Sequence, residues 1–112
     1  MAQTPSGHTV LYGRSAKEND ELCRNAMEND IWFHVSGFPG SHCLILIQND
    51  SPPVLKCDLQ FVASLAKLRS KAKLLPKVSV DYCPFKNVYI DWDNRKRHAG
   101  EVMIRQSRAL WV

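Results

Sequence analysis

The hydrophobic and polar positions near the N-terminus predict a strand followed by a helix. We expect the strand over His8–Tyr12. Ser15, with Glu18 three residues later, forms a capping-box pattern, which predicts a helix from Ala16 to Met27. Asn19 falls on or beside the apolar stripe of that helix. A side-chain amide in that position must find hydrogen-bond partners, so Asn19 is either a structural contact or a site residue.

Two apolar runs in the next part of the chain predict a pair of strands joined by a turn. The runs are Ile31–Val35 and Cys43–Ile47, and each has the length of a strand. Between them lie Gly37, Pro39 and Gly40, which are typical turn residues. The pattern therefore predicts a β-hairpin.

The segment after this hairpin has the hydrophobic spacing of a helix. It runs from Val54 to Leu74, and Pro76 ends it. Apolar residues seven, four, three and four positions apart draw one face, made of Val54, Phe61, Leu65, Leu68 and Ala72. The solvent side and flank of the helix would carry Lys67, Arg69, Lys71 and Lys73. The prediction is a basic helix whose apolar face packs into the core.

The last third of the chain alternates short apolar segments with turns. Strands are expected over 77–83, 86–92, 101–105 and 108–112. The polar segment Asp93–Gly100 would form a hairpin tip, and the last two strands a closing hairpin around Gln106–Ser107. The resulting element order is β-α-β-β-α-β-β-β-β. Because it lacks the βαβ alternation, it predicts an α+β fold with two main helices and a largely antiparallel sheet.

The composition is typical of one compact domain. With 112 residues, 45% of them hydrophobic, residues 1–112 should form a single domain that needs neither disulfides nor metal to bury its core. There is no apolar run of membrane-spanning length and no secretory-signal pattern at the start, so we expect a soluble cytoplasmic monomer without a membrane contact. The four cysteines show no CxxC spacing, which predicts reduced, mostly buried thiols.

The net charge of +4 conceals an uneven distribution along the chain. Residues 1–56 hold four basic and six acidic side chains, whereas residues 57–112 hold eleven basic and five acidic ones. The second half is therefore strongly basic, and polyanions are the obvious partners for such a surface. Solubility alone is the alternative explanation for a basic half.

Two histidines, His34 and His42, stand where the predicted hairpin would favour valine or isoleucine. A metal site could add Asp30 and His98 as ligands, but the spacing fits no zinc motif, so no metal is expected. Nucleophilic catalysis could use Ser41 in its turn, but the GxSxG pattern is missing. The remaining alternative is structural, with the imidazole nitrogens bonded to neighbouring carbonyl groups.

RNA contact is the interpretation that also uses the basic residues. Cations in separate segments can neutralise phosphates, and they are Lys67, Arg69, Lys71, Lys73, Lys86, Arg95, Lys96 and Arg97. Arg14 precedes a helix N-terminus, whose free N–H groups suit an anion. Trp32 and His34, if they face solvent, would offer a stacking surface to an unpaired base. A solvated basic face is the alternative, and convergence of these charges in space separates the two.

Several short motifs together resemble one known family. They are Gly13–Arg14, Asn19–Asp20 and Leu22, the strand DIWFH at Asp30–His34, and PGSH at Pro39–His42. Further along, Ser70–Ala72, Val80–Tyr82, Lys86 and Val88 also correspond. This pattern closely resembles the NFACT-R domain, the RNA-binding module that ends the NFACT proteins of ribosome-associated quality control and that also occurs as small stand-alone proteins. The resemblance covers residues 10 to 112.

The resemblance implies a domain that binds RNA, without catalysis or cofactor. It implies tRNA or ribosomal RNA as the ligand and the large ribosomal subunit as a partner. The family-motif positions are Arg14, Asn19, Asp20, Asp30, Trp32, His34, Gly40, Ser41, His42, Asp81 and Tyr82. The motif alone does not divide them between RNA contact and support of the fold. The role of full-length members in nascent-chain tailing is not carried over, because their other domains have no counterpart in the sequence.

Three hypotheses follow from the sequence. The first is a module for structured or single-stranded RNA, in which basic residues contact phosphates and Trp32, His34 and His42 shape the site. The second is an RNA- or nucleotide-processing enzyme that uses His34, His42 and Asp30. The third is an adaptor whose basic face meets an acidic protein.

Overall fold

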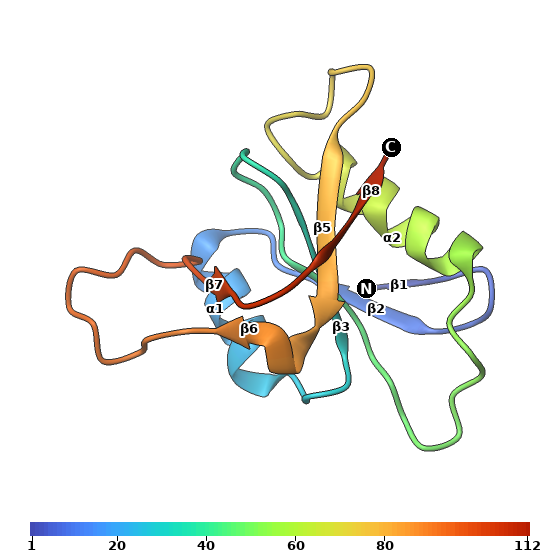
Figure 1. Ribbon diagram of the computed structural model, residues 1–112, viewed down its shortest axis with the longest axis horizontal. Helices are drawn as coiled ribbons and strands as arrows, with labels where there is room; N and C mark the ends of the chain where they lie inside the picture. Colours follow the sequence, from blue (N-terminus) through green and yellow to red (C-terminus); the bar gives the residue numbers. More distant parts are fainter.

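An antiparallel sheet of six strands forms the centre of the molecule (Figure 1). The structure is a computed structural model that describes residues 1–112 throughout. In spatial order the strands are β1 (Ala2–Gln3), β2 (Thr9–Tyr12), β4 (Cys43–Ile45), β3 (Ile31–Val35), β5 (Ser79–Pro84) and β8 (Arg108–Trp111). The short strand β1 was not expected from the sequence. The predicted α+β class with a largely antiparallel sheet is confirmed.

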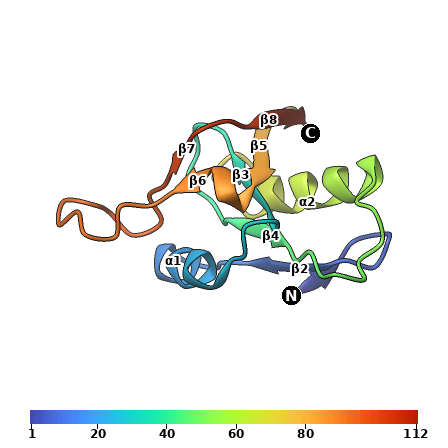
Figure 2. The ribbon, with the colours of Figure 1, turned by 60° about the horizontal axis from the view of Figure 1, so that its bottom comes forward.

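The two faces of the sheet are buried against different parts of the chain. The helices are α1 (Ala16–Asn25) and α2 (Lys56–Leu68), which lie apart in Figure 2. Because strand side chains alternate between faces, Phe33 packs with Val62 of α2, whereas Trp32 packs with Cys23 of α1. Neither helix is long and apolar enough to cross a membrane.

The first helix begins where the sequence predicts. The Ser15 hydroxyl accepts a hydrogen bond from the Glu18 N–H at 3.1 Å. The Glu18 carboxylate, in turn, accepts from the N–H of Arg14 at 3.0 Å. The helix ends at Asn25 rather than at Met27, because the backbone becomes extended at the next residue.

The second helix is shorter than predicted. It spans Lys56–Leu68, and Ser70 ends it, since the Ser70 hydroxyl donates to the Lys67 carbonyl at 2.8 Å and accepts from the Ala72 N–H at 3.1 Å. These local bonds replace the helical ones. The prediction of a continuous basic helix was therefore wrong, and the turn after α2 carries Arg69, Lys71 and Lys73.

The buried face of α2 also differs from the predicted one. Phe61 and Leu68 are 39% and 66% exposed, whereas Val62, Ala63 and Ala66 are fully buried. The alanines let the helix axis approach the sheet closely, so this narrow face forms the central contact. Of the predicted apolar face, Leu65 still packs against the edge of the core, whereas Phe61 and Leu68 lie at the surface.

A buried carboxylate fixes the start of α2. Asp58 accepts hydrogen bonds from the N–H groups of Leu55 at 2.8 Å and Ser6 at 2.9 Å, and the Nε2 atom of His8 lies 3.9 Å away. Burial disfavours the ionised carboxylate, but these hydrogen bonds outweigh it and hold the pKa of Asp58 below its usual value. The N-terminal segment is thereby tied to the helix.

The C-terminal strands pair differently from the prediction. After a short 3-10 helix (Phe85–Asn87), β6 (Val88–Tyr89) pairs with β7 (Met103–Ile104) in a separate ribbon. This ribbon and its loop form an arm, residues 88–104, that projects from the sheet (Figure 1). β8 then returns to pair with β5. The expected closing hairpin was wrong, because β7 and β8 lie in different sheets.

The cysteines are free thiols, as the sequence predicts. Cys23, Cys43 and Cys83 are buried, and Cys57 is exposed. Burial raises the pKa of the Cys23 and Cys43 thiols to about 12, so both stay protonated at neutral pH.

Candidate nucleic-acid interface

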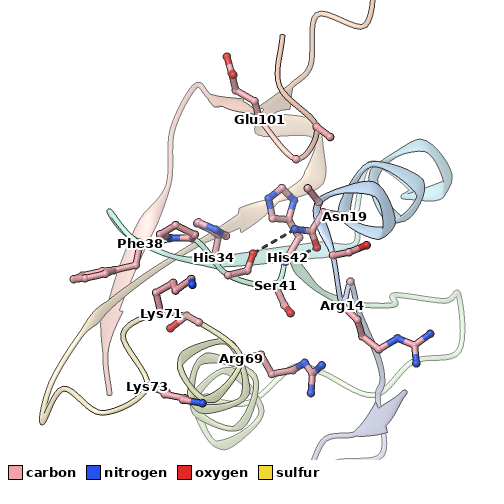
Figure 3. A pocket seen from close by; sticks show the side chains of 18 of the residues that line it. Arg14, Asn19, His34, Phe38, Ser41, His42, Arg69, Lys71, Lys73 and Glu101 are labelled. Atoms are coloured by element: carbon pink, nitrogen blue, oxygen red, sulfur yellow. Dashed lines mark hydrogen bonds between the residues drawn. The ribbon is translucent and has the colours of Figure 1, made fainter.

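An open cleft of about 1030 Å³ lies where separate segments of the chain meet (Figure 3). Its walls are the start of α1 (13–19), the β3–β4 loop (37–42), the turn after α2 (69–73) and the end of the arm loop (99–101). The predicted site residues that line it are Arg14, Asn19, His34, Gly40, Ser41, His42, Arg69, Lys71 and Lys73. Residues distant in sequence thus share one concave surface.

The cleft is positively charged. Its cationic residues are Arg14, Arg69, Lys71 and Lys73, and Glu101 is its one acidic residue. Figure 3 shows Glu101 on the opposite side of the cleft from the two lysines. The Arg69 guanidinium lies over the Tyr12 ring, 4.3 Å from its centroid, and this cation–π contact holds the arginine in place. Such a surface is suited to phosphate oxygens.

Arg14 stands at the N-terminal end of α1, as the sequence predicts. The first N–H groups of a helix have no acceptor within the helix, and the dipole there favours anions. Arg14 pairs with Glu18 at 3.1 Å between Nε and Oε1, and hydrogen bonding in this pair raises the pKa of Arg14 and lowers that of Glu18. The Arg14 side chain remains 71% exposed, so it is accessible to a ligand.

The β3–β4 loop is held against the turn after α2 by backbone hydrogen bonds. The Ser41 N–H donates to the Arg69 carbonyl at 3.1 Å, and the Lys71 N–H donates to the Pro39 carbonyl at 2.9 Å. Between these bonds lies an isolated bridge at Gly40. The two walls of the cleft are therefore fixed relative to each other.

Asn19 joins the same loop to α1. Its side-chain nitrogen donates to the Gly40 carbonyl at 3.3 Å, and its oxygen accepts from the His42 N–H at 3.0 Å. Asn19 is only 6% exposed. Of the two roles that the sequence left open, the structure therefore supports the structural contact.

His42 is a buried, neutral histidine. Its Nδ1 atom accepts a hydrogen bond from the indole N–H of Trp32 at 3.3 Å, which places the remaining imidazole proton on Nε2. Burial, and then the neighbouring His34, lower the pKa of His42 to about 3. His42 therefore contributes no positive charge to the cleft at neutral pH.

His34 is half-buried and is more accessible than His42. Its ring stacks on Trp32, with centroids 5.9 Å apart and planes at 16°, and meets the edge of His42 at 5.1 Å. Burial lowers its pKa as well. The two histidines thus give the cleft shape and hydrogen-bonding groups, whereas the arginines and lysines give it charge.

Comparison with known protein families identifies the family of this chain. The family model described as the NFACT protein RNA binding domain matches residues 1–106. The chain belongs to the NFACT RNA-binding domain family. The resemblance found in the sequence is confirmed.

Named relatives of this NFACT RNA-binding domain are longer proteins. The Rqc2 homolog RqcH of Bacillus subtilis (strain 168) is 34% identical over 87 residues, which cover 77% of this chain and 15% of the relative. Coiled-coil domain-containing protein 25 of Mus musculus is 27% identical over 99 residues, which cover 84% of this chain and 43% of the relative. The chain therefore spans less than half the length of either relative.

A solved structure has the same fold. It is the C-terminal of the fibronectin/fibrinogen-binding protein from Streptococcus suis, with a TM-score of 0.84 and 28% sequence identity. The likeness covers 98% of this chain and 43% of that one.

Trp32 is a motif residue whose proposed RNA contact the structure contradicts. The ring is 1% exposed, because the alternation along β3 turns it toward α1. It cannot stack on a base. Trp32 instead donates a hydrogen bond from its indole N–H to His42, and its ring stacks against the ring of His34.

Asp30 is also a structural residue. Its two carboxylate oxygens accept from the N–H groups of Met27 and Ile47, each at 2.9 Å, so it ties the end of α1 to the end of β4. Four residues of extended strand, about 13 Å, separate it from His34. No three His, Cys, Asp or Glu side chains come together in a way that could hold a metal ion.

Arg97 was expected to contact phosphate, but it forms an internal ion pair. Its guanidinium donates to both oxygens of Asp20, at 2.6 and 3.1 Å, and the Gly100 N–H donates to the same carboxylate at 2.9 Å. Hydrogen bonding with Arg97 lowers the pKa of Asp20 despite its burial. Arg97 and Arg24 flank the Trp92 ring at 4.6 and 3.9 Å. These contacts dock the arm loop on α1 and so build one wall of the cleft.

The other predicted cations lie outside the cleft. The Lys67 ammonium donates to the Pro76 carbonyl at 3.4 Å, and Lys86, Arg95 and Lys96 are exposed elsewhere on the surface. RNA contact required the predicted cations to converge in space, and only Arg14, Arg69, Lys71 and Lys73 do so.

Two motif residues in β5 contribute to the pairing of β5 with β3. Asp81 lies opposite His34 in the strand register. Its negative charge raises the pKa of His34 and so partly offsets the effect of burial. Tyr82 lies opposite Phe33, and the two rings stack with centroids 5.7 Å apart.

The sequence reasoning missed several residues that line the cleft, among them Glu101 and Phe38. Phe38 lies in the β3–β4 loop beside the turn glycines and is 38% exposed. Its position next to Gly37 in a loop that also carries PGSH was the available signal, because large apolar residues at loop tips are seldom needed for the core.

Proposed function

We propose that this NFACT RNA-binding domain binds tRNA or ribosomal RNA through the cleft and that it does not catalyse a reaction. The observation that carries the proposal is the convergence of Arg14, Arg69, Lys71 and Lys73 around one cleft that contains a single acidic residue. Neutralising phosphates at such a site releases counterions and supplies most of the binding free energy.

The geometry of the histidines supports a binding role. A general base needs an accessible nitrogen with a pKa near the working pH. His42 is 3% exposed, its Nδ1 is occupied by Trp32, and its pKa is lowered to about 3. Asp30 is committed to two backbone N–H groups. Two of the three residues that the enzyme hypothesis would use, His42 and Asp30, are therefore poorly suited to that role.

The named relatives support a setting in ribosome-associated quality control. Proteins named Rqc2 homolog RqcH share this domain, of which 77% aligns. We propose that the domain acts as a cytoplasmic monomer and that it contacts RNA at the large ribosomal subunit. Longer RNA would also reach Lys86, Arg95 and Lys96 outside the cleft.

The test is charge reversal inside the cleft. The Lys71→Glu/Lys73→Glu variant is expected to bind tRNA roughly 10- to 100-fold more weakly in moderate salt, because two phosphate contacts become repulsive. The slope of log affinity against log salt concentration should flatten by roughly 1.4 to 1.8. Fluorescence anisotropy with labelled tRNA over a series of salt concentrations measures both quantities.

The matched control is Lys56→Glu/Arg108→Glu, which makes the same change in net charge. Neither residue lines the cleft, and the length of α2, ~20 Å, separates Lys56 from Arg69. This variant should keep most of the wild-type affinity. Equal losses in the two variants would mean that net charge, and not the cleft, determines binding.

A further inference from the structure

Phe38 is a large apolar side chain that the core does not use. It belongs to neither hydrophobic cluster and is 38% exposed on the rim of the cleft. The preceding residue, Gly37, has a φ of +78°, a left-handed conformation that turns the loop at this point. The loop therefore holds an aromatic ring out at the edge of a cationic site.

The backbone of a cationic residue lies beside the loop that carries this ring. The hydrogen bond from the Lys71 N–H to the Pro39 carbonyl, at 2.9 Å, places Lys71 next to the residue that follows Phe38. Figure 3 shows Phe38 and Lys71 on the same side of the cleft, with Lys73 and Arg69 further along. An aromatic face beside a row of cations is the arrangement that binds a nucleic-acid strand by stacking and charge together.

The neighbouring floor of the cleft is also aromatic and rigid. His34 is held flat on Trp32, with an angle of 16° between the planes, and burial keeps it neutral by lowering its pKa. A neutral ring does not compete with the lysines for phosphate. Rings thus gather at one end of the cleft, and charges extend along the turn after α2.

We propose that the cleft holds an unpaired nucleotide, with its base stacked on Phe38 and its flanking phosphates on Lys71, Lys73 and Arg69. This inference rests on the proposed function and adds the class of RNA: loops and single strands are bound in preference to duplex. A base inside a duplex has both faces covered by its neighbours, so an unpaired base offers Phe38 a face that the interior of a duplex does not.

The size of the cleft is consistent with this ligand. Its volume of about 1030 Å³ is at the upper end of pockets that enclose a small molecule. A nucleotide with its adjacent phosphates therefore fits, whereas the body of a helix would remain outside. The duplex could touch the lysines but would not engage the ring.

The experiment compares an RNA hairpin that has an unpaired loop with a blunt duplex of the same stem. Anisotropy titrations at one salt concentration should show tighter binding of the hairpin by the wild-type protein. Phe38→Ala should weaken hairpin binding by roughly 5- to 150-fold, the equivalent of one lost base–aromatic stack, and leave duplex binding unchanged. Phe38→Trp should retain the preference, because it keeps a stacking face.

Two results would overturn the inference: equal affinity of the wild type for hairpin and duplex, or an unchanged hairpin affinity in Phe38→Ala. Thermal melting of Phe38→Ala should match the wild type, since the ring lies outside the core. Lys71→Glu/Lys73→Glu separates the two proposals. If that variant binds both RNAs more weakly while Phe38→Ala binds both as the wild type does, the inference fails and the proposed function stands. If neither variant loses affinity, both fail.

Discussion

Acidification from pH 7 to pH 5 is expected to lower the free energy of unfolding by about 2 kcal/mol. The cause is His42, whose pKa is about 3 in the folded protein, against an ordinary value of 6.5. Between these values the unfolded chain binds a proton that the folded chain excludes, so stability decreases as pH falls through this range. Urea denaturation at the two pH values measures the difference.

The pH range of the stability loss distinguishes the effect of the histidines from that of the carboxylates. His34 also has a lowered pKa, so it contributes in the same direction. Asp58 and Asp20 have lowered pKa values too, but a carboxylate with a lowered pKa loses its stabilising effect only below its unfolded value, near pH 4. A loss already present at pH 5 therefore belongs to the histidines.

Two variants test the assignment. His42→Gln should keep an acceptor for the Trp32 indole but lose most of the difference between pH 7 and pH 5. His98→Gln removes a histidine whose side chain is 90% exposed, so it should behave as the wild type does. A wild-type protein that is equally stable at both pH values would show that water reaches and protonates the His42 ring.

Local signals in the sequence were sufficient for the start of α1 and for the β3–β4 pair. Ser15 and Glu18 lie within one turn of each other, and Gly37 lies between two apolar runs, so short-range pattern and structure agree. The same signals misplaced the buried face of α2. The spacing of Phe61 and Leu68 was as regular as that of Val62 and Ala66, and only the close fit to the sheet selects the smaller residues.

Long-range contacts decided the rest of the site. Arg97 and Asp20 are 77 positions apart, and no local pattern indicates that one neutralises the other. β8 pairs with β5 rather than with its nearest neighbour β7, which a hairpin pattern cannot reveal. The convergence of Arg14 with Arg69 likewise depends on a backbone bridge between Gly40 and Ser70. The residue types of the site were therefore predictable from sequence, but their grouping was not.

Replacement of Gly13 by alanine is expected to destabilise the fold by roughly 2 to 3 kcal/mol. A Cβ atom at this position would overlap the side-chain oxygen of Asn19 and lie 2.7 Å from its backbone nitrogen. Asn19 cannot move away, because it is bonded to Gly40 and His42. The melting temperature should fall by about 10 °C, as measured by circular dichroism or calorimetry.

Gly40→Ala and Gly37→Ala separate steric overlap from backbone strain. At Gly40 a Cβ would lie 2.7 Å from the Ser70 Cβ, whereas at Gly37 it would meet nothing within 4 Å and cost only the positive φ, about 1 kcal/mol. Gly40→Ala should therefore destabilise more than Gly37→Ala. It should also weaken RNA binding, because the loop must move off the turn that carries Arg69. A Gly13→Ala or Gly40→Ala protein that melts like the wild type would contradict the close contacts that fix the walls of the cleft.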